Sequence, residues 1–261
     1  MTVWRRQPPI NPTSTFVYYR PTKTFDHFHR GLNLEEVCKL PAQGKITTYR
    51  GIPDMADNFI DRIYSTSGND KIKAAYDDWA DQYDDDLRSR NYLTPERVAQ
   101  ALRRFHTETS TPILDFGCGS GLSGTALHAV GFSNIDGADI SEAMLDVARR
   151  KGLYKRLWSL HADQPLPFER GAYSVVTAAG AISHGAAPGV VYDQLLDILA
   201  PGAVFVFSLN DESRKMEEYA GPLRASLSEG RVRMLSEEHG PHFDHAGTTI
   251  GSTVYVVECL R

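Results

Sequence analysis

Residues 112–121 read Pro-Ile-Leu-Asp-Phe-Gly-Cys-Gly-Ser-Gly, an apolar run that ends in an acid and continues into a loop with glycine at every second position. The apolar run is typical of a buried parallel strand, and residues 122–130 predict a helix directly after the loop. Glycine has no Cβ, so the loop can adopt positive φ and let a ligand approach its backbone. The stretch therefore predicts a nucleotide-sized pocket at the carboxyl end of a strand.

The acid within this stretch, Asp115, bears on which ligand the pocket takes. A carboxylate repels a pyrophosphate and attracts a cation, so Asp115 favours an amino-acid-bearing sulfonium compound over a dinucleotide. The spacing Gly119-x-Gly121-x-x-Gly124, with Asp139 further along, also satisfies the dinucleotide fingerprint. An NAD(P)-dependent oxidoreductase, or a glycine-rich turn without any ligand, therefore stays open at this point.

Strand and helix candidates alternate around the glycine loop. Strands are predicted near residues 112–116, 134–138, 156–161, 173–179 and 203–208, and helices near 122–130, 141–151 and 189–199. Two further strand candidates, 231–235 and 252–260, follow with no full helix between them. This order predicts an α/β fold: a three-layer α-β-α sandwich around a seven-stranded, mostly parallel, Rossmann-like sheet with an antiparallel closing strand.

Two helices are predicted ahead of the glycine loop. Apolar residues recur at three- and four-residue spacing from Ile72 to Leu87, which indicates one amphipathic helix whose other face is acidic. Thr94-Pro95 then opens a second helix that runs to Phe105, with proline in its first turn.

The N-terminal segment differs in composition from the rest of the chain. Residues 1–50 hold eight Lys or Arg and three Asp or Glu, a charge of +5, whereas the net charge of all 261 residues is −5. This segment is rich in proline and has little helical or strand periodicity. We therefore expect residues 1–54 to be a loosely structured appendage and residues 55–261 to form the compact domain.

Composition narrows the classes of partner and location. No run of 18 or more apolar residues exists, and the first residues have no apolar signal core, so no membrane span is expected. The three cysteines are scattered, which fits a reducing, cytoplasmic setting. The acidic net charge argues against a nucleic-acid partner and leaves a small-molecule substrate as the default, with the chain a monomer or homodimer.

Four stretches resemble the successive motifs of class I S-adenosylmethionine-dependent methyltransferases: ILDFGCGSGLSG, IDGADISEAMLDVAR, HADQPLPF and YSVVTAAGAISH. The resemblance covers about residues 70–260. YDDWADQYDDDL, EEHGPHF and STVYVVE resemble more closely the methyltransferase-like protein 27 group, which comprises the Williams–Beuren region methyltransferase and its bacterial relatives.

The resemblance implies an enzyme that uses S-adenosylmethionine as cofactor and methylates an oxygen, nitrogen or sulfur atom of a small molecule. It also implies that the helical segment at about 69–106 covers the cofactor as a lid. The sequence offers no clear catalytic base, so a non-catalytic S-adenosylmethionine-binding sensor or partner subunit remains an alternative.

The resemblance assigns binding roles to three residues at the glycine loop and to one acid at the end of the second strand. Asp115, Gly117 and Gly119 match the loop that holds the methionine part of the cofactor. Asp139 ends the second strand and matches the acid that accepts hydrogen bonds from both ribose hydroxyls. A simple cap of the helix after Ser141 is the other interpretation of Asp139.

The residues that follow match the adenine site of the family. Ile140 and Met144 are predicted to pack on the adenine, although ordinary core packing would place the same residue types there. Asp163 matches the acid that accepts from the adenine amino group, and a surface turn before Pro165 is its alternative. Gln164 is predicted to offer its backbone amide to the same ring.

The resemblance places the remaining cofactor contacts near the sulfonium. Ala179 ends the fourth strand, where a small residue lets the backbone approach the ligand. Tyr76, Trp79 and Tyr83 share one face of the predicted lid helix, and aromatic faces attract cations such as a sulfonium. Core packing is the competing interpretation for all three rings.

Histidines are the remaining candidates for chemistry. His184 lies just beyond the fourth strand and is the candidate general base, with an inactive loop histidine as the alternative. His239, His242 and His245 recur at three-residue spacing in what we expect to be a Gly/Pro-containing loop, which does not by itself fix ligand geometry. We therefore expect no metal site there and assign these histidines to a structural or substrate-rim role.

Overall fold

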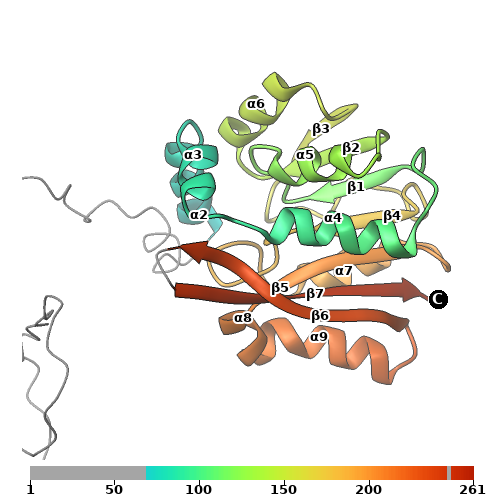
Figure 1. The fold of residues 1–261 in the computed structure, drawn as a ribbon. Helices are drawn as coiled ribbons and strands as arrows, with labels where there is room; N and C mark the ends of the chain where they lie inside the picture. The colour runs from blue at the N-terminus through green and yellow to red at the C-terminus, as the bar shows by residue number, and fades with distance from the viewer. Residues whose placement is uncertain (1–68, 246–247) are drawn as a thin grey trace, which may run out of the picture. The chain divides into compact units, whose positions relative to one another are not determined.

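The computed structural model describes residues 69–245 and 248–261, so the appendage expected over residues 1–54 lies outside the described residues. Seven strands form one sheet in the order β3-β2-β1-β4-β5-β7-β6 (Figure 1). In chain order the strands are β1 (Ile113–Phe116), β2 (Ile135–Asp139), β3 (Arg156–Ser159), β4 (Val175–Ala178), β5 (Val204–Asn210), β6 (Val232–His245) and β7 (Thr248–Cys259).

Helices connect most of the strands. They are α2 (Asn69–Trp79), α3 (Tyr83–Ser89), α4 (Thr94–Phe105), α5 (Leu122–Ala129), α6 (Glu142–Lys151), α7 (Val191–Asp197), α8 (Asp211–Lys215) and α9 (Glu217–Ser228). Strands β1 to β5 pair in parallel, whereas β7 runs antiparallel to both β5 and β6. The predicted Rossmann-like sheet with an antiparallel closing strand is therefore confirmed.

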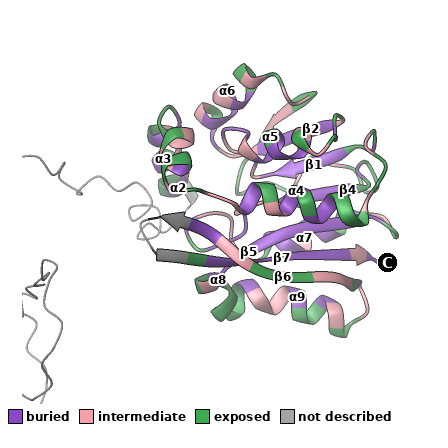
Figure 2. Cartoon of the chain, in the orientation of Figure 1, coloured by how far each residue is buried: buried purple, intermediate pink, exposed green. Residues whose placement is uncertain are grey.

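Alternating side chains of the buried strands pack into two cores on opposite faces of the sheet. In β1, Ile113 packs with α4 and α5, whereas its neighbour Leu114 packs with α7 and α9; Val175 and Val176 of β4 divide in the same way. The central strands are almost wholly buried, as Figure 2 shows. Helical layers on both faces give the three-layer sandwich predicted from the alternation.

Two features of the helices differ from the prediction. The helix expected from residue 72 to 87 is interrupted at residues 80–82, and α3 begins anew at Tyr83. Three acids in the first turn of α3 favour a helix start there because the helix N-terminus carries positive partial charge. Helices α8 and α9 were not predicted; in α9, Gly221 and Pro222 interrupt the helical pattern.

The topology places the ligand crevice. The chain crosses from β3 back to β4 beside β1, so the strand order reverses between β1 and β4. In open α/β sheets, ligands bind outside the carboxyl ends of the strands at such a reversal. The glycine loop after β1, the end of β2 and the end of β4 meet there.

Candidate functional site

The glycine loop adopts backbone conformations that favour glycine. Gly117, Gly119 and Gly121 have φ of 65°, 51° and 93°. A Cβ on Gly117 would lie 2.3 Å from the Cβ of Ala181, whereas a Cβ on Gly119 would meet no atom within 4 Å. The loop is therefore packed against the end of β4 at Gly117 and opens onto free space at Gly119.

That space is a cavity of about 1080 Å³, part of it open to solvent, which we call the loop cavity. Its volume exceeds the ~300 Å³ lower range of small-molecule sites. Most of the residues that the sequence assigned to cofactor binding line it: Tyr76, Tyr83, Gly117, Gly119, Asp139, Ile140, Met144, Gln164 and Ala179. The fold thus brings together side chains and loops from five separate segments of the chain.

Asp139 at the end of β2 is the acid that faces the loop cavity. Its Oδ2 accepts a hydrogen bond from the amide of Gly119 (2.9 Å), and its Oδ1 accepts one from the amide of Ser141 (2.9 Å). Burial raises the pKa of this carboxyl, which backbone hydrogen bonds partly offset. The N-cap of α6 is Ser141 and not Asp139, because Ser141 Oγ accepts a hydrogen bond from the Met144 amide (3.1 Å).

Asp115 is not among the residues that line the loop cavity, which differs from the expectation that its carboxylate belongs to the cofactor-binding residues. The side chain is fully buried beneath the loop and accepts hydrogen bonds from the hydroxyls of Ser123 (2.6 Å), Tyr154 (2.7 Å) and Thr177 (2.9 Å). Burial raises its pKa to about 6, although the three hydrogen bonds lower it, and the nearby Asp139 raises it further. Asp115 therefore supports the loop from below.

Three further assignments are placed differently from the prediction. Asp163 is exposed and is not among the residues that line the loop cavity, although its neighbours Ala162 and Gln164 are. The amide of Gln164 donates to the carbonyl of His161 (3.1 Å), so that amide is already engaged in a turn. Trp79 is buried and donates from Nε1 to Asp86 Oδ2 (2.7 Å), outside the loop cavity.

Helices α2 and α3, together the lid segment, are tied to the site by side-chain hydrogen bonds. Asp77 Oδ1 accepts from Ser141 Oγ (2.6 Å) at the start of α6. Asp84 Oδ1 accepts from Ser120 Oγ (2.5 Å), and its other oxygen pairs with Lys151 Nζ (2.5 Å). The lid segment is therefore held against both the glycine loop and α6 by two of its acids.

A second cavity adjoins the loop cavity beneath the lid segment, and we call it the aromatic cavity. The two share Tyr76, Tyr83, Tyr92 and Gly180. A Cβ on Gly180 would lie 2.3 Å from the hydroxyl oxygen of Tyr92, so glycine allows this tyrosine to close over the end of β4. The other described residues that line the aromatic cavity include no Lys, Arg, Asp or Glu: they are Trp79, Leu87, Ser183, His184, Gly185, Ser208, Asn210, His242 and Phe243.

Tyr92 and Phe243 were missed by the sequence analysis. They belong to segments about 150 positions apart that meet in an isolated antiparallel bridge between these two residues. Their rings lie 5.1 Å apart, and the His242 ring lies 5.1 Å from that of Tyr92. The available sequence signal was the fragment EEHGPHF, which resembles a motif of the methyltransferase-like protein 27 group and contains both His242 and Phe243.

The histidines occupy different surroundings. His184 is exposed at the aromatic cavity, and its amide donates to Ser213 Oγ (3.2 Å). His239 Nε2 lies 2.9 Å from Asp211 Oδ1 at the surface, whereas His242 is buried, and the side chain of His245 lies outside the described residues. In the described ranges, no three His, Cys, Asp or Glu side chains converge as metal ligands would.

Among residues 69–245 and 248–261, no helix is both long and apolar enough to cross a bilayer.

The chain is similar in sequence to known methyltransferases. A family model described as a methyltransferase domain matches residues 88–246. Human methyltransferase-like protein 27 is 31% identical over 197 residues, which cover 74% of each chain. The demethylmenaquinone methyltransferase of Clavibacter sepedonicus is 32% identical over 143 residues, 52% of this chain and 56% of the relative.

One solved structure extends the similarity to the fold. A chain in the complex between the Haloferax volcanii Trm112 methyltransferase activator and a methyltransferase superposes with a TM-score of 0.54 at 18% identity. The match covers 71% of this chain and 98% of that one.

Proposed function

The chain belongs to the S-adenosylmethionine-dependent methyltransferases, and we propose that its methyl acceptor is a small molecule held in the aromatic cavity. The observation that carries this proposal is the shared wall between the two cavities, formed by Tyr76, Tyr83, Tyr92 and Gly180. An acceptor in the aromatic cavity would lie next to a cofactor in the loop cavity. The NAD(P) alternative is set aside by the family match.

The residues of the loop cavity fit this cofactor. The open space at Gly119 allows the methionine part to approach the loop backbone, and Asp139, which lines the same cavity, is the proposed acceptor for the ribose hydroxyls. Ile140 and Met144 offer an apolar surface for the adenine. When bound, S-adenosylmethionine supplies a methyl group already activated on a positively charged sulfur.

Charge and aromatic surface suit a sulfonium in this position. Besides burial, repulsion from Asp139 raises the pKa of Asp115, and repulsion from Asp77 raises the pKa of Asp139; a cation nearby would relieve this repulsion. The three tyrosines of the shared wall add ring faces that attract a cation. A lid segment held over the bound cofactor would limit the access of water to this place, which would strengthen both effects.

The lining of the aromatic cavity supports a small, uncharged acceptor. Because its described lining has no Lys or Arg, it offers no partner for a phosphate backbone. The Clavibacter relative is named for methylating demethylmenaquinone, which agrees with a small-molecule acceptor. His184 at this cavity is the proposed general base for an acceptor that must lose a proton; a neutral amine would need none.

Native mass spectrometry of the purified chain tests the proposed function. We expect a retained mass of S-adenosylmethionine or S-adenosylhomocysteine, and transfer of a methyl group to at least one member of a small-molecule panel. Methylation of RNA or a protein in preference to every small molecule would contradict the proposed acceptor class. Binding without any turnover would favour the non-catalytic alternative.

Replacing Tyr83 by alanine is expected to weaken cofactor affinity about fivefold or more, because one of the rings over the sulfonium is lost. The sheet is expected to stay folded, since Tyr83 packs against the lid cluster around Trp79, with ring centroids 4.6 Å apart, rather than against either sheet core. Calorimetric titration with S-adenosylhomocysteine and with S-adenosylmethionine measures the effect. Tyr83→Phe, which keeps the ring, is the matched control; an unchanged dissociation constant for Tyr83→Ala would count against the lid.

A further inference from the structure

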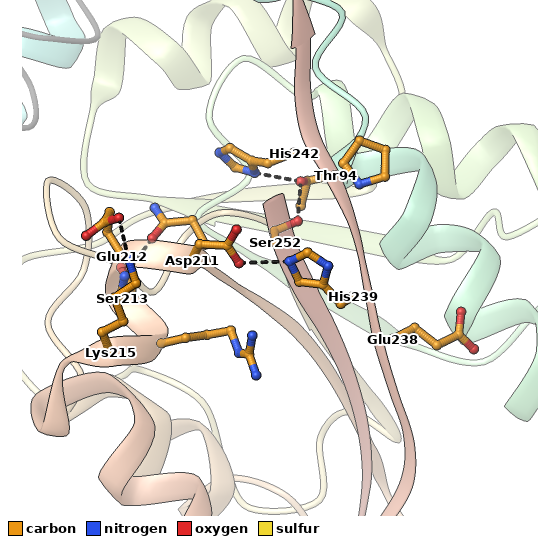
Figure 3. Close-up of polar contacts among 12 residues, drawn as sticks. Thr94, Asp211, Glu212, Ser213, Lys215, Glu238, His239, His242 and Ser252 are labelled. Carbon is orange, nitrogen blue, oxygen red and sulfur yellow. Dashed lines mark hydrogen bonds and ion pairs between the residues drawn. The ribbon is translucent and has the colours of Figure 1, made fainter. Parts of the chain in front are cut away.

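His242 is a buried polar side chain of the aromatic cavity that the proposed function has not yet used. Only 6% of its surface is exposed, and it lines the cavity between Tyr92 and Phe243. Figure 3 shows its ring joined by hydrogen bonds to Thr94 and then Ser252. The inference drawn from it rests on the proposed function, because it concerns the acceptor of that same site.

The backbone of β6 aims this side chain. Pro241 pairs with Gly251 and Phe243 with Ile250, so His242 is the extra residue of a β-bulge. The carbonyl of His242 accepts from the amide of Leu93 (3.0 Å), which fixes the bulge against the start of α4. Bulges redirect side chains and are common beside active sites, so the position of His242 is consistent with a role in the cavity.

A chain of hydrogen bonds sets which ring nitrogen carries the hydrogen. Arg97 Nη1 can only donate, and it donates to Ser252 Oγ (2.8 Å). Ser252 Oγ lies 3.2 Å from Thr94 Oγ1, which lies 2.7 Å from His242 Nδ1. All hydroxyl hydrogens in this buried group are used if Ser252 donates to Thr94 and Thr94 donates to Nδ1.

The opposite direction would leave a buried hydrogen without an acceptor. If His242 Nδ1 donated to Thr94, and Thr94 to Ser252, the hydroxyl hydrogen of Ser252 would have no acceptor among its partners in the described part of the chain. A buried donor left unsatisfied costs about 1–3 kcal/mol, so the first direction is favoured. Nδ1 is then an acceptor, and the hydrogen of the neutral ring sits on Nε2.

Burial, with a smaller effect from Arg97, keeps the ring neutral. Burial lowers the pKa of His242 to about 4; Arg97 lowers it further, and Asp211 opposes that effect. The hydrogen bonds of this side chain in the described residues involve Nδ1, which leaves Nε2 for the cavity. At neutral pH the ring therefore offers the cavity one uncharged N–H donor.

We propose that His242 positions the methyl acceptor by donating from Nε2 to an uncharged oxygen on an aromatic ring, such as a phenol hydroxyl or a ring-bound carbonyl. The flat rings of Tyr76, Trp79, Tyr92 and Phe243 fit a planar molecule, and the described lining holds no ionised partner for a charged one. His242 is a positioning residue in this role, because its hydrogen bond orients the acceptor and removes no proton from it.

The first test determines the tautomer and charge of the His242 ring directly and requires no methyl transfer. ¹⁵N NMR of imidazole-labelled protein is expected to show His242 as the neutral Nε2–H form from pH 5.5 to 8, with Nδ1 as acceptor. Thr94→Val removes the hydroxyl that donates to Nδ1. The ¹⁵N chemical shifts of the His242 ring are therefore expected to change, whereas those of His239 are expected to stay the same. An Nδ1–H form, or a charged ring at pH 7, in the wild-type chain would overturn the proposal.

The second test measures recognition with matched probes. With S-adenosylhomocysteine present, ¹⁹F NMR titration is expected to show 4-fluorophenol binding about three- to tenfold more tightly than 4-fluorotoluene, the range of one neutral hydrogen bond. His242→Phe keeps a flat ring without a donor and is expected to abolish the preference for 4-fluorophenol. His242→Gln keeps an N–H donor and is expected to retain part of that preference. The surface variant His239→Ala is the control and keeps the wild-type ratio.

The outcomes separate this proposal from the proposed function. A phenol preference that survives in His242→Phe, or tighter binding of 4-fluorobenzoate than of 4-fluorophenol, would overturn the proposal even if the chain is an active methyltransferase. The same titrations without S-adenosylhomocysteine report on His242 if cofactor binding itself fails. Retained cofactor affinity in His242→Phe shows that a lost preference is not a loss of folding.

Discussion

Replacing Asp139 by alanine is expected to weaken binding of S-adenosylmethionine by more than tenfold. In the proposed complex the variant loses two charge-assisted hydrogen bonds to the ribose, each worth about 1.5–3 kcal/mol, and the loss of one alone already corresponds to tenfold. It also loses the acceptor that holds the amides of Gly119 and Ser141, so the glycine loop and the start of α6 are less well ordered. Both effects lower the affinity.

Isothermal titration calorimetry with S-adenosylmethionine measures this effect. Asp146→Ala is the matched control, because it removes an exposed carboxylate of α6 that forms only a surface ion pair with Arg149. Asp163→Ala is a second comparison: since Asp163 lies outside the cavity lining, we expect a smaller loss there than at Asp139. Equal affinity of Asp139→Ala and wild type would show that the ribose is held elsewhere.

The parts of this site that are local in sequence could be predicted. A loop with glycine at every second position after an apolar strand has few conformations available, so Gly117 and Gly119 could be placed at the crevice. The acid at the end of β2 follows from strand alternation, and parallel strands bring their carboxyl ends to one edge. These constraints act within one βα unit at a time.

The parts that depend on distant pairing could not be predicted. The direction of the Asp115 carboxylate depends on Tyr154 and Thr177, which come from two other segments of the chain. The aromatic cavity depends on a bridge between Tyr92 and Phe243 and on a bulge at His242. A period of two predicts a strand but not which residue is left unpaired in its ladder.

The interruption of the lid helix illustrates a different limit. The three- and four-residue apolar spacing continues from Trp79 to Tyr83 and Leu87, so periodicity alone favours one helix. In the structure the chain turns at residues 80–82, which lets Asp77 reach Ser141 while Asp84 reaches Ser120. Tertiary hydrogen bonds therefore decide the local structure where helix propensity is neutral.

The buried carboxylate of Asp115 leads to the second large expected effect, which is on stability. Asp115→Ala leaves three buried hydroxyls without their acceptor and opens a small cavity, so we expect a loss of about 3 kcal/mol or more in the free energy of unfolding. Chemical denaturation at pH 7 measures this loss. A loss below about 1 kcal/mol would show that the hydroxyls find other partners.

The same residue is expected to make stability depend on pH in a direction opposite to that of most acids. Burial raises the pKa of Asp115 to about 6 in the folded chain, whereas an unfolded aspartate has a pKa of about 3.9. The folded state therefore binds this proton more tightly than the unfolded state does, and the resulting stabilisation is complete below pH 4 and is lost as the pH rises through 6.

Asp115→Asn cannot titrate, so the unfolding free energy of wild type minus that of the variant should fall between pH 4 and 7, by up to ~3 kcal/mol. A difference that instead rises with pH would mean that the three hydroxyls outweigh burial and hold the carboxyl pKa below its ordinary value. S-adenosylmethionine should flatten the fall, because its positive charge beside the glycine loop would also favour the ionised form of Asp115 beneath that loop.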